Sequence, residues 1–245
     1  MKKIPVSSTI LAALIFVVGF INHVYHKQLI AKNTDIKNNF ESKLLNIALE
    51  HQKQINQLKA GISQDNIRRW NILNTEKVIE TVNKNIPHTI RMDYAEWIVN
   101  ETDKYEKVSP AIILGLMAQE SRFNDSAVSH VGAKGLGQIM SLTGQDICEH
   151  LKISYVNGIE FNAKMNIKMT VWYLNRLIQH YNNIEQALAH YNGGYRQAYR
   201  YSLVHRKNLS DDEKYQLSRL AEETRDYVPK VLSNFKRFEE MMTLE

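Results

Sequence analysis

A mostly α-helical protein is predicted from three observations. Apolar residues recur at helical spacing, helix-capping patterns precede several of these runs, and no series of alternating apolar and polar residues indicates a sheet. Of the 245 residues, 44% are hydrophobic and 23% are charged, which is ordinary for a globular chain. The single cysteine, Cys148, excludes an internal disulfide and a cysteine-based metal site.

The chain begins with a hydrophobic segment. Residues 4–21 form a run of 18 residues without a charge, and Lys2 and Lys3 precede it. This length and charge pattern predict a transmembrane anchor within residues 1–26, with the N-terminus cytoplasmic and the remainder exported. We therefore expect a single-pass membrane protein whose larger part lies on the exported side. A cleaved signal peptide is the alternative.

Residues 27–87 are predicted to be a helical stalk or linker. Between positions 36 and 62 the regular positions follow an 11-residue repeat, which is typical of a nearly straight helical coil. These positions are Ile36, Phe40, Leu44, Ile47, His51, Ile55, Leu58 and Ile62. The stripe fits either a single amphipathic helix or self-association. A second helix is predicted for about 67–85, before Pro87.

The third predicted domain, residues 88–245, is a series of capped helices. Asp93 with Glu96 resembles a capping box, and Ser109-Pro110 resembles an N-cap followed by proline at the first helical position. Further helices are predicted at about 141–151, 163–181, 184–191, 212–225 and 227–242. Only the stretch 124–139, which contains three glycines, lacks helical texture, and we expect a small irregular or hairpin segment there.

Charge is distributed unevenly along the chain. Residues 1–87 contain 12 Lys/Arg and 6 Asp/Glu, whereas residues 88–245 contain 19 and 20. The C-terminal domain therefore lacks the basic surface that nucleic-acid binding requires. The basic N-terminal part fits either a solvated helix surface or contact with an anionic lipid or cell-wall polymer.

One carboxylate stands on an apolar helix face. In the sequence IILGLMAQE (112–120), Glu120 follows Ile113, Leu116 and Met117 at helical spacing. If the carboxyl is enclosed, desolvation raises its pKa, and the group can then act as a general acid near neutral pH. Taken alone, the pattern also fits a salt-bridged residue at the edge of the core.

Three later motifs set this helix in a family pattern. Glu120-Ser121-Arg122-Phe123 is followed by GLGQ (135–138), HYNGG (190–194) and Tyr227-Val228. In this order the motifs resemble the catalytic domain of soluble-type (SLT) lytic transglycosylases, which has a goose-lysozyme-like α-helical fold. The resemblance covers roughly residues 93–235. Gly137 and His190 depart from it, because methionine and alanine are usual at these places.

The resemblance implies a reaction and a set of site residues. The family cleaves the β-1,4 bond between N-acetylmuramic acid and N-acetylglucosamine in peptidoglycan without water and leaves a 1,6-anhydro ring. Glu120 would be the catalytic acid and then base. Ser121, Gln138, Tyr191, Asn192 and Tyr227 would bind substrate, and no metal or cofactor is implied.

Two other functions remain open at this point. The same fold could serve a water-using muramidase, or a non-catalytic glycan-binding scaffold of a wall-spanning machine. Peptidoglycan glycan strands are the expected partner, together with the membrane through the N-terminal helix. Wall-spanning secretion, conjugation or phage machinery is a candidate partner as well.

Overall fold

The computed structural model of the protein describes residues 64–243 without interruption. Nearer the N-terminus it describes residues 25–27, 29, 32, 33, 35–37, 39, 43, 46, 47, 49–51 and 53, which are helical and exposed. The predicted membrane segment, 4–21, lies outside the described residues. Among the helices that the described residues form, none combines the length and the apolar character needed to cross a membrane.

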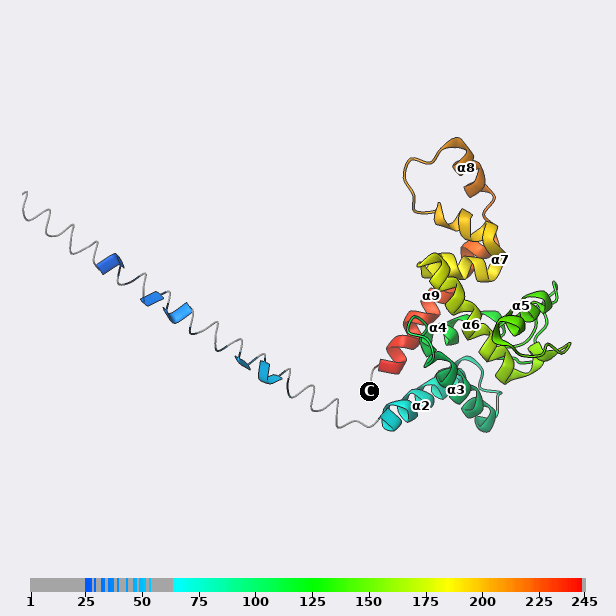
Figure 1. The fold of residues 1–245 in the computed structure, drawn as a ribbon, viewed down its shortest axis with the longest axis horizontal. Coiled ribbons are helices and arrows are strands. Elements are labelled where there is room, and N and C mark those ends of the chain that lie inside the picture. Colours follow the sequence, from blue (N-terminus) through cyan, green and yellow to red (C-terminus); the bar gives the residue numbers. More distant parts are fainter. Residues whose placement is uncertain are drawn as a thin grey trace, which may run out of the picture. The chain divides into compact units, whose positions relative to one another are not determined.

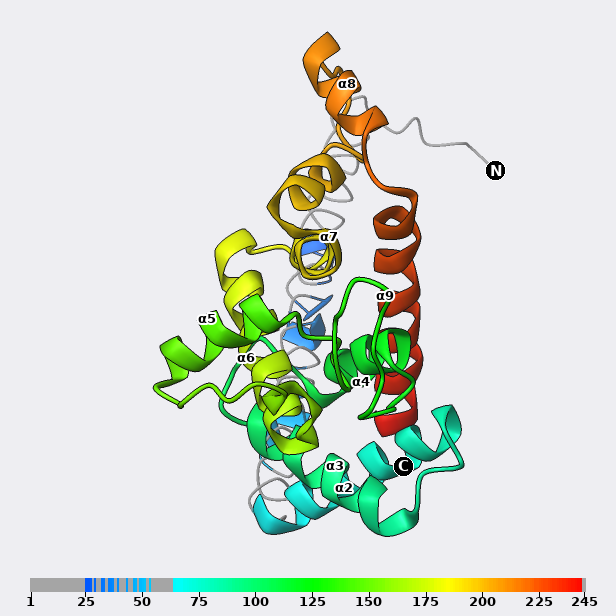
Figure 2. The same cartoon turned by 90° about the vertical axis from the view of Figure 1, so that its right-hand side faces the viewer.

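The compact unit that spans Gln64–Glu245 is built from helices (Figures 1 and 2). In chain order they are α2 (Gln64–Val82), α3 (His88–Thr102), α4 (Pro110–Glu120), α5 (Ser141–Leu151), the short 3-10 helix η1 (Ile159–Phe161), α6 (Ala163–Tyr181), α7 (Ile184–Ser202), α8 (Asp211–Ser218) and α9 (Glu222–Thr243). Within 64–243 the only β-structure is two isolated bridges, Val128 with Lys134 and Lys134 with Ile139. The mostly α-helical prediction is confirmed, and the segment 124–139 is irregular as expected.

One predicted helix start agrees with the structure and another does not. Ser109 is the N-cap of α4 and Pro110 its first residue, as predicted. The capping box predicted at Asp93 is wrong, because α3 already begins at His88, directly after Pro87. Pro87 is extended and directly precedes the first helical residue, so the helix begins there. Asp93 and Glu96 lie inside an amphipathic run, and a polar pair at such a place does not start a new helix.

Helix α4 lies at the centre of the core. Its residues 111–117 are all buried, and it packs most extensively along α9. A Cβ atom on Gly115 would lie 3.0 Å from both Val231 O and Phe235 N, so glycine allows the two backbones to approach closely. This contact brings the C-terminal end of α4 beside the first turns of α9.

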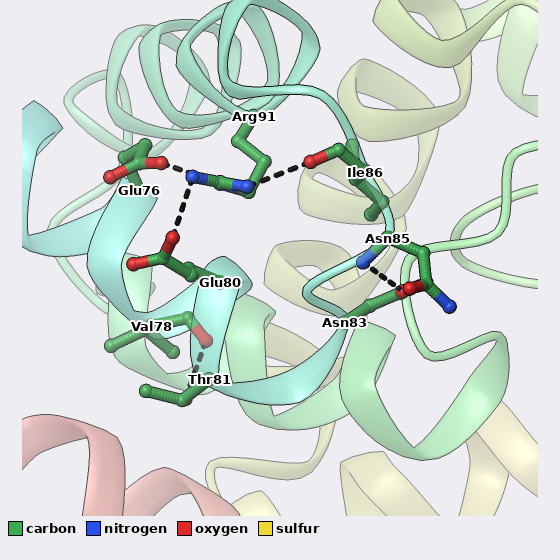
Figure 3. A network of polar contacts seen from close by, with 8 residues as sticks. All are labelled: Glu76, Val78, Glu80, Thr81, Asn83, Asn85, Ile86 and Arg91. Carbon is green, nitrogen blue, oxygen red and sulfur yellow. Dashed lines mark hydrogen bonds and ion pairs between the residues drawn. The ribbon is translucent and has the colours of Figure 1, made fainter.

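Helix α2 packs within the same unit, although residues 27–87 were predicted to be a stalk. Val78 and Ile79 of α2 are buried in the main core. Figure 3 shows how the buried Arg91 of α3 joins the two helices: its Nε donates to Glu76 Oε1 at 2.5 Å and its Nη2 to Glu80 Oε1 at 2.8 Å. The structure thus groups α2 with the helices that follow it.

The last helices differ from their predicted bounds. Helix α7 continues past the predicted end at 191 to Ser202, with a kink at Gly194, whose φ is 76°. The predicted helix 212–225 is split, because α8 ends at Ser218 and α9 begins at Glu222. Figure 2 shows α8 at one end of the unit, beyond the start of α9.

Candidate active site

Glu120 and Tyr227 meet where α4 and α9 pack together. The Tyr227 hydroxyl donates a hydrogen bond to Glu120 Oε1 at 2.5 Å, although the two residues are 107 positions apart in sequence. Tyr227 is buried, whereas Glu120 is the last residue of α4 and is partly exposed. The carboxyl therefore stands at the edge of the core with one phenol fixed against it.

The surroundings of Glu120 favour its protonated form. Burial raises the pKa of the carboxyl from 4.5 to about 7, the Tyr227 hydrogen bond opposes this rise, and the nearby Glu223 adds to it. A carboxyl with a pKa near 7 is protonated in part of the molecules at neutral pH. It can therefore give up a proton and take one back under the same conditions.

A cleft of about 740 Å³ opens at this carboxyl. Its lining joins the end of α4, the irregular segment, the middle of α7 and the start of α9. The lining residues are Gln119, Glu120, Ser129, His130, Val131, Ala133, Gln138, Met140, Tyr191, Asn192, Glu222, Glu223, Asp226, Tyr227 and Lys230. Four of the five predicted substrate-binding residues line the cleft with Glu120, and Ser121 does not.

Ser121 and Gln138 shape the irregular wall of the cleft. The Ser121 hydroxyl donates to Leu136 O at 2.8 Å, which ties the end of α4 to this wall. The Gln138 side-chain amide donates to Ala127 O and Gly135 O, at 3.2 and 2.9 Å. Both amide donor contacts of Gln138 therefore go to its own wall, and its carbonyl oxygen has no hydrogen bond within the described part of the chain.

Side chains of α6 and α7 also hold this wall through hydrogen bonds. Asn166 is fully buried; its Oδ1 accepts from Gly137 N at 2.7 Å, and its Nδ2 donates to Lys134 O and Glu160 O. The Tyr191 hydroxyl donates to Gly137 O at 2.7 Å. Asn166 gave no signal in the sequence, because a polar residue within a helical run is usually exposed.

The two departures from the family pattern have different structural settings. At Gly137 a Cβ atom would lie 1.9 Å from Thr170 Oγ1, so Thr170 fills the space that a larger residue would need. His190 does not line the cleft; its Nδ1 pairs with the Tyr181 hydroxyl at 2.8 Å, and burial lowers its pKa.

Asn192 belongs to a polar chain across the cleft. Its Oδ1 accepts from the Thr224 hydroxyl at 2.6 Å, and its Nδ2 donates to Glu223 Oε1 at 3.2 Å. This chain fixes the Asn192 side chain next to the Glu223 carboxylate.

The residues of α9 that line the cleft beside Tyr227 were not predicted. Glu223 and Lys230 stand four residues before and three residues after Tyr227, on the same helical face. This spacing would have identified them if 223–230 had been taken as one helix. Within the described residues no group of three His, Cys, Asp or Glu side chains is placed to hold a metal ion.

Comparison with known proteins relates part of this chain to a family. Residues 98–212 match the family model described as transglycosylase SLT domain. The fold is similar to that of the lytic transglycosylase Slt from Pseudomonas aeruginosa (23% identity, TM-score 0.50), with 68% of this chain and 29% of that one covered. It is also similar to the 70-kDa soluble lytic transglycosylase from Escherichia coli (22% identity, TM-score 0.53), with 73% and 30% covered.

This chain thus spans less than a third of the length of either solved protein. The predicted kind of domain is confirmed by the family match and by the shared fold. Residues 98–212 thus match a transglycosylase SLT domain, within a fold that is shared with solved lytic transglycosylases.

Proposed function

We propose that the protein is a peptidoglycan lytic transglycosylase and that Glu120 is its single acid and base. The observation that carries this proposal is the Glu120 carboxyl, which has a pKa of about 7, accepts a hydrogen bond from Tyr227 and opens onto a large cleft. The SLT domain match supports peptidoglycan glycan strands as the substrate.

The proposed reaction needs one proton carrier. Protonated Glu120 donates its proton to the glycosidic oxygen as the bond from that oxygen to C1 of N-acetylmuramic acid breaks. The C6 hydroxyl oxygen of the same sugar bonds to C1, and the Glu120 carboxylate takes the C6 hydroxyl proton. The proton is thereby restored, and a 1,6-anhydro end is formed without water. Because the nucleophile is part of the substrate, its effective concentration is high.

The decisive experiment compares wild type with Glu120→Gln on purified sacculi. Wild type should release anhydromuropeptides, and the variant should lose at least about 1,000-fold in rate, because amide nitrogen cannot replace the acid. The melting curve of the variant checks that it is folded. Unchanged release by a folded Glu120→Gln variant would exclude the proposed role.

A water-using muramidase is the second candidate, because Glu223 brings another carboxylate into the cleft. A second carboxylate could activate water on the opposite face of the sugar. Mass spectrometry separates the two reactions, since hydrolysis adds one water to each new end. Reducing ends that disappear in Glu223→Gln would favour hydrolysis, whereas anhydro ends from both proteins would favour the transglycosylase.

We further propose that residues 1–26 anchor the protein in the inner membrane and that the catalytic domain acts in the periplasm. The uncharged run 4–21 behind two lysines supports this location. A wall-spanning secretion, conjugation or phage machine would then be a suitable partner. Fractionation of cells tests the location: the protein should remain with membranes in high salt, and added protease should reach it only in spheroplasts.

A further inference from the structure

A second cavity lies between the C-terminal half of α7 and α8. It has a volume of about 350 Å³ and is lined by Tyr195, Arg196, Tyr199, Arg200, Tyr215, Gln216 and Arg219. No residue of this set lines the Glu120 cleft. The volume is at the lower end of the range of small-ligand sites, about 300 to 1,000 Å³.

The three arginines of this cavity carry charge that the described residues do not neutralise. Arg200 donates to Gln216 Oε1 at 3.5 Å and to Arg219 O at 3.1 Å, and Arg219 donates to the Tyr215 hydroxyl at 3.1 Å. These acceptors are uncharged, and within the uninterrupted range 64–243 no carboxylate forms an ion pair with any of the three arginines. A guanidinium group with free donors is suited to bind a carboxylate with two parallel hydrogen bonds.

The tyrosines add exposed aromatic faces to the same cavity. Tyr195, Tyr199 and Tyr215 are 65%, 40% and 55% exposed, and the Arg219 guanidinium lies over the Tyr215 ring. Tyrosine side chains offer an apolar face and a hydroxyl, and they lose little conformational freedom on binding. The cavity therefore combines anion recognition with flat surfaces for an aliphatic or amide chain.

The cavity continues the elements that form the Glu120 cleft. On α7, Asn192 of the cleft is followed, across the kink at Gly194, by Tyr195 and Arg196. Before α9, Arg219 is three residues from Glu222 of the cleft. The two sites are therefore adjacent along the chain at two places, on α7 and before α9.

The charges of the two sites are complementary to a branched ligand. Four carboxyl groups line the cleft, on Glu120, Glu222, Glu223 and Asp226, against the single lysine Lys230. Uncharged N-acetyl sugars can enter this cleft, whereas free carboxylates are repelled from it. The arginine cavity attracts carboxylates.

We infer that the cavity between α7 and α8 binds the carboxylates of a peptidoglycan stem peptide while the glycan strand lies in the Glu120 cleft. This inference rests on the proposed function, because it assigns the peptide part of the same substrate to a second site. The cavity then favours glycan that still carries its peptides.

Binding by the full chain with Glu120→Gln, which prevents turnover, tests the inference. Isothermal titration calorimetry compares two purified glycan fragments of equal length. One carries its stem peptides; the other is stripped by an amidase, and the lactyl carboxylates so freed are then converted to amides, so that its sugars stay uncharged. The stem-bearing fragment should bind at least about 10-fold more tightly, as expected for charge-assisted hydrogen bonds. Adding Arg196→Gln and Arg219→Gln should remove this preference and leave the affinity for the stripped fragment unchanged.

A matched control removes two positive charges elsewhere. Arg69→Gln with Arg237→Gln changes two exposed arginines on α2 and α9, outside both sites, and should keep the preference. Equal binding of the two fragments to the Glu120→Gln protein, or a preference that survives Arg196→Gln/Arg219→Gln, would overturn the inference and leave the proposed function standing. Absence of binding to both fragments would overturn both.

A lipid source of the anion gives a different result. Vesicles that contain an anionic phospholipid are titrated against the same proteins. If the cavity variants lose vesicle binding but keep the preference for stem-bearing glycan, the cavity is a headgroup site and the stem-peptide inference fails.

Discussion

The hydrogen bond that Tyr227 donates to Glu120 favours the charged form of the acid. A phenol that donates to the carboxylate stabilises the charged form and holds the pKa of Glu120 below the value that burial alone would give. The same contact fixes the orientation of Oε1 at the cleft. Glu120 can therefore donate a proton at neutral pH and still be an adequate base afterwards.

Replacement of Tyr227 by phenylalanine should shift the pH dependence of cleavage. Without the donated hydrogen bond the pKa of Glu120 rises above about 7, so the alkaline limb of kcat/KM should move to higher pH. We expect kcat to fall by about 10- to 100-fold, the usual range for loss of a hydrogen bond to a charged group. Tyr201→Phe removes a buried hydroxyl outside the cleft and should change neither quantity. An unchanged profile for Tyr227→Phe would show that its hydroxyl does not act on Glu120.

Stability should also depend on the ionisation of Glu120. The pKa of this carboxyl is about 7 in the fold and near 4.5 in the unfolded chain, so the native state holds more protons between these values. The free energy of unfolding should therefore decrease as pH rises from 4.5 to 7. Glu120→Gln lacks this contribution. The urea midpoint of the variant minus that of wild type should therefore increase between pH 5 and pH 8. A constant difference between the two proteins over this range would contradict the raised pKa.

At the scale of single residues, sequence reasoning found those with a distinctive motif. Glu120 broke an apolar stripe, and Tyr227 followed from the order of the family motifs. Glu223, Asp226 and Lys230 were missed because charged residues at the start of a helix are common and ordinarily solvated. Ser121 was expected to contact substrate, whereas its hydroxyl is bonded to Leu136 O in the structure.

At the scale of elements, the wall 134–138 depends on the helix beneath it. Asn166 of α6 accepts a hydrogen bond from the backbone N–H of Gly137, and Thr170 of α6 fills the space beside Gly137. The family pattern has methionine at this position, but Thr170 Oγ1 lies only 1.9 Å from where its Cβ atom would be. The identity of residue 137 is thus coupled to that of residue 170.

A pair of substitutions tests this coupling. Gly137→Ala should destabilise the domain by about 1 to 3 kcal/mol, because the new methyl group overpacks against Thr170. Thr170→Ala in the same chain removes the clashing oxygen and should recover part of the loss. Urea unfolding of the two single variants and the double variant gives the coupling energy. Strictly additive losses would show that the two side chains do not compete for this space.

Helices with clear caps and stops could be predicted from sequence, and the others could not. The bounds of α5 and α6 agree with the sequence signals. The end of α7 was placed too early, since Gly193 and Gly194 are typical of a C-terminus, yet here Gly194 forms a kink and the helix resumes. The break between α8 and α9 carries neither glycine nor proline and gave no signal.

At the scale of the whole molecule, α2 determines where the folded unit begins. Its buried residues and the ion pairs of Arg91 join it to α3 and to the core. The predicted domain boundary at 87/88 follows Pro87, which marks only the turn between two packed helices. Local turn chemistry cannot reveal whether the preceding helix packs on the core or stands apart.

Truncation should distinguish these two boundaries. A fragment of residues 64–245 should unfold with the same urea midpoint as the full chain. A fragment of residues 88–245 exposes the core and leaves the buried Arg91 without Glu76, and it should lose at least about 3 to 5 kcal/mol. Circular dichroism during urea titration measures both. Equal stability of the two fragments would restore the boundary at 87/88.

The sequence separation of Glu120 and Tyr227 has a consequence for biosynthesis. The two groups are 107 residues apart, and the pair forms only when α9 packs along α4. Such a long-range contact forms late, and during translation α4 emerges well before α9. A nascent chain cut short before Tyr227 therefore lacks the phenol that lowers the pKa of Glu120, so the paired acid exists only after α9 has been synthesised and has packed along α4.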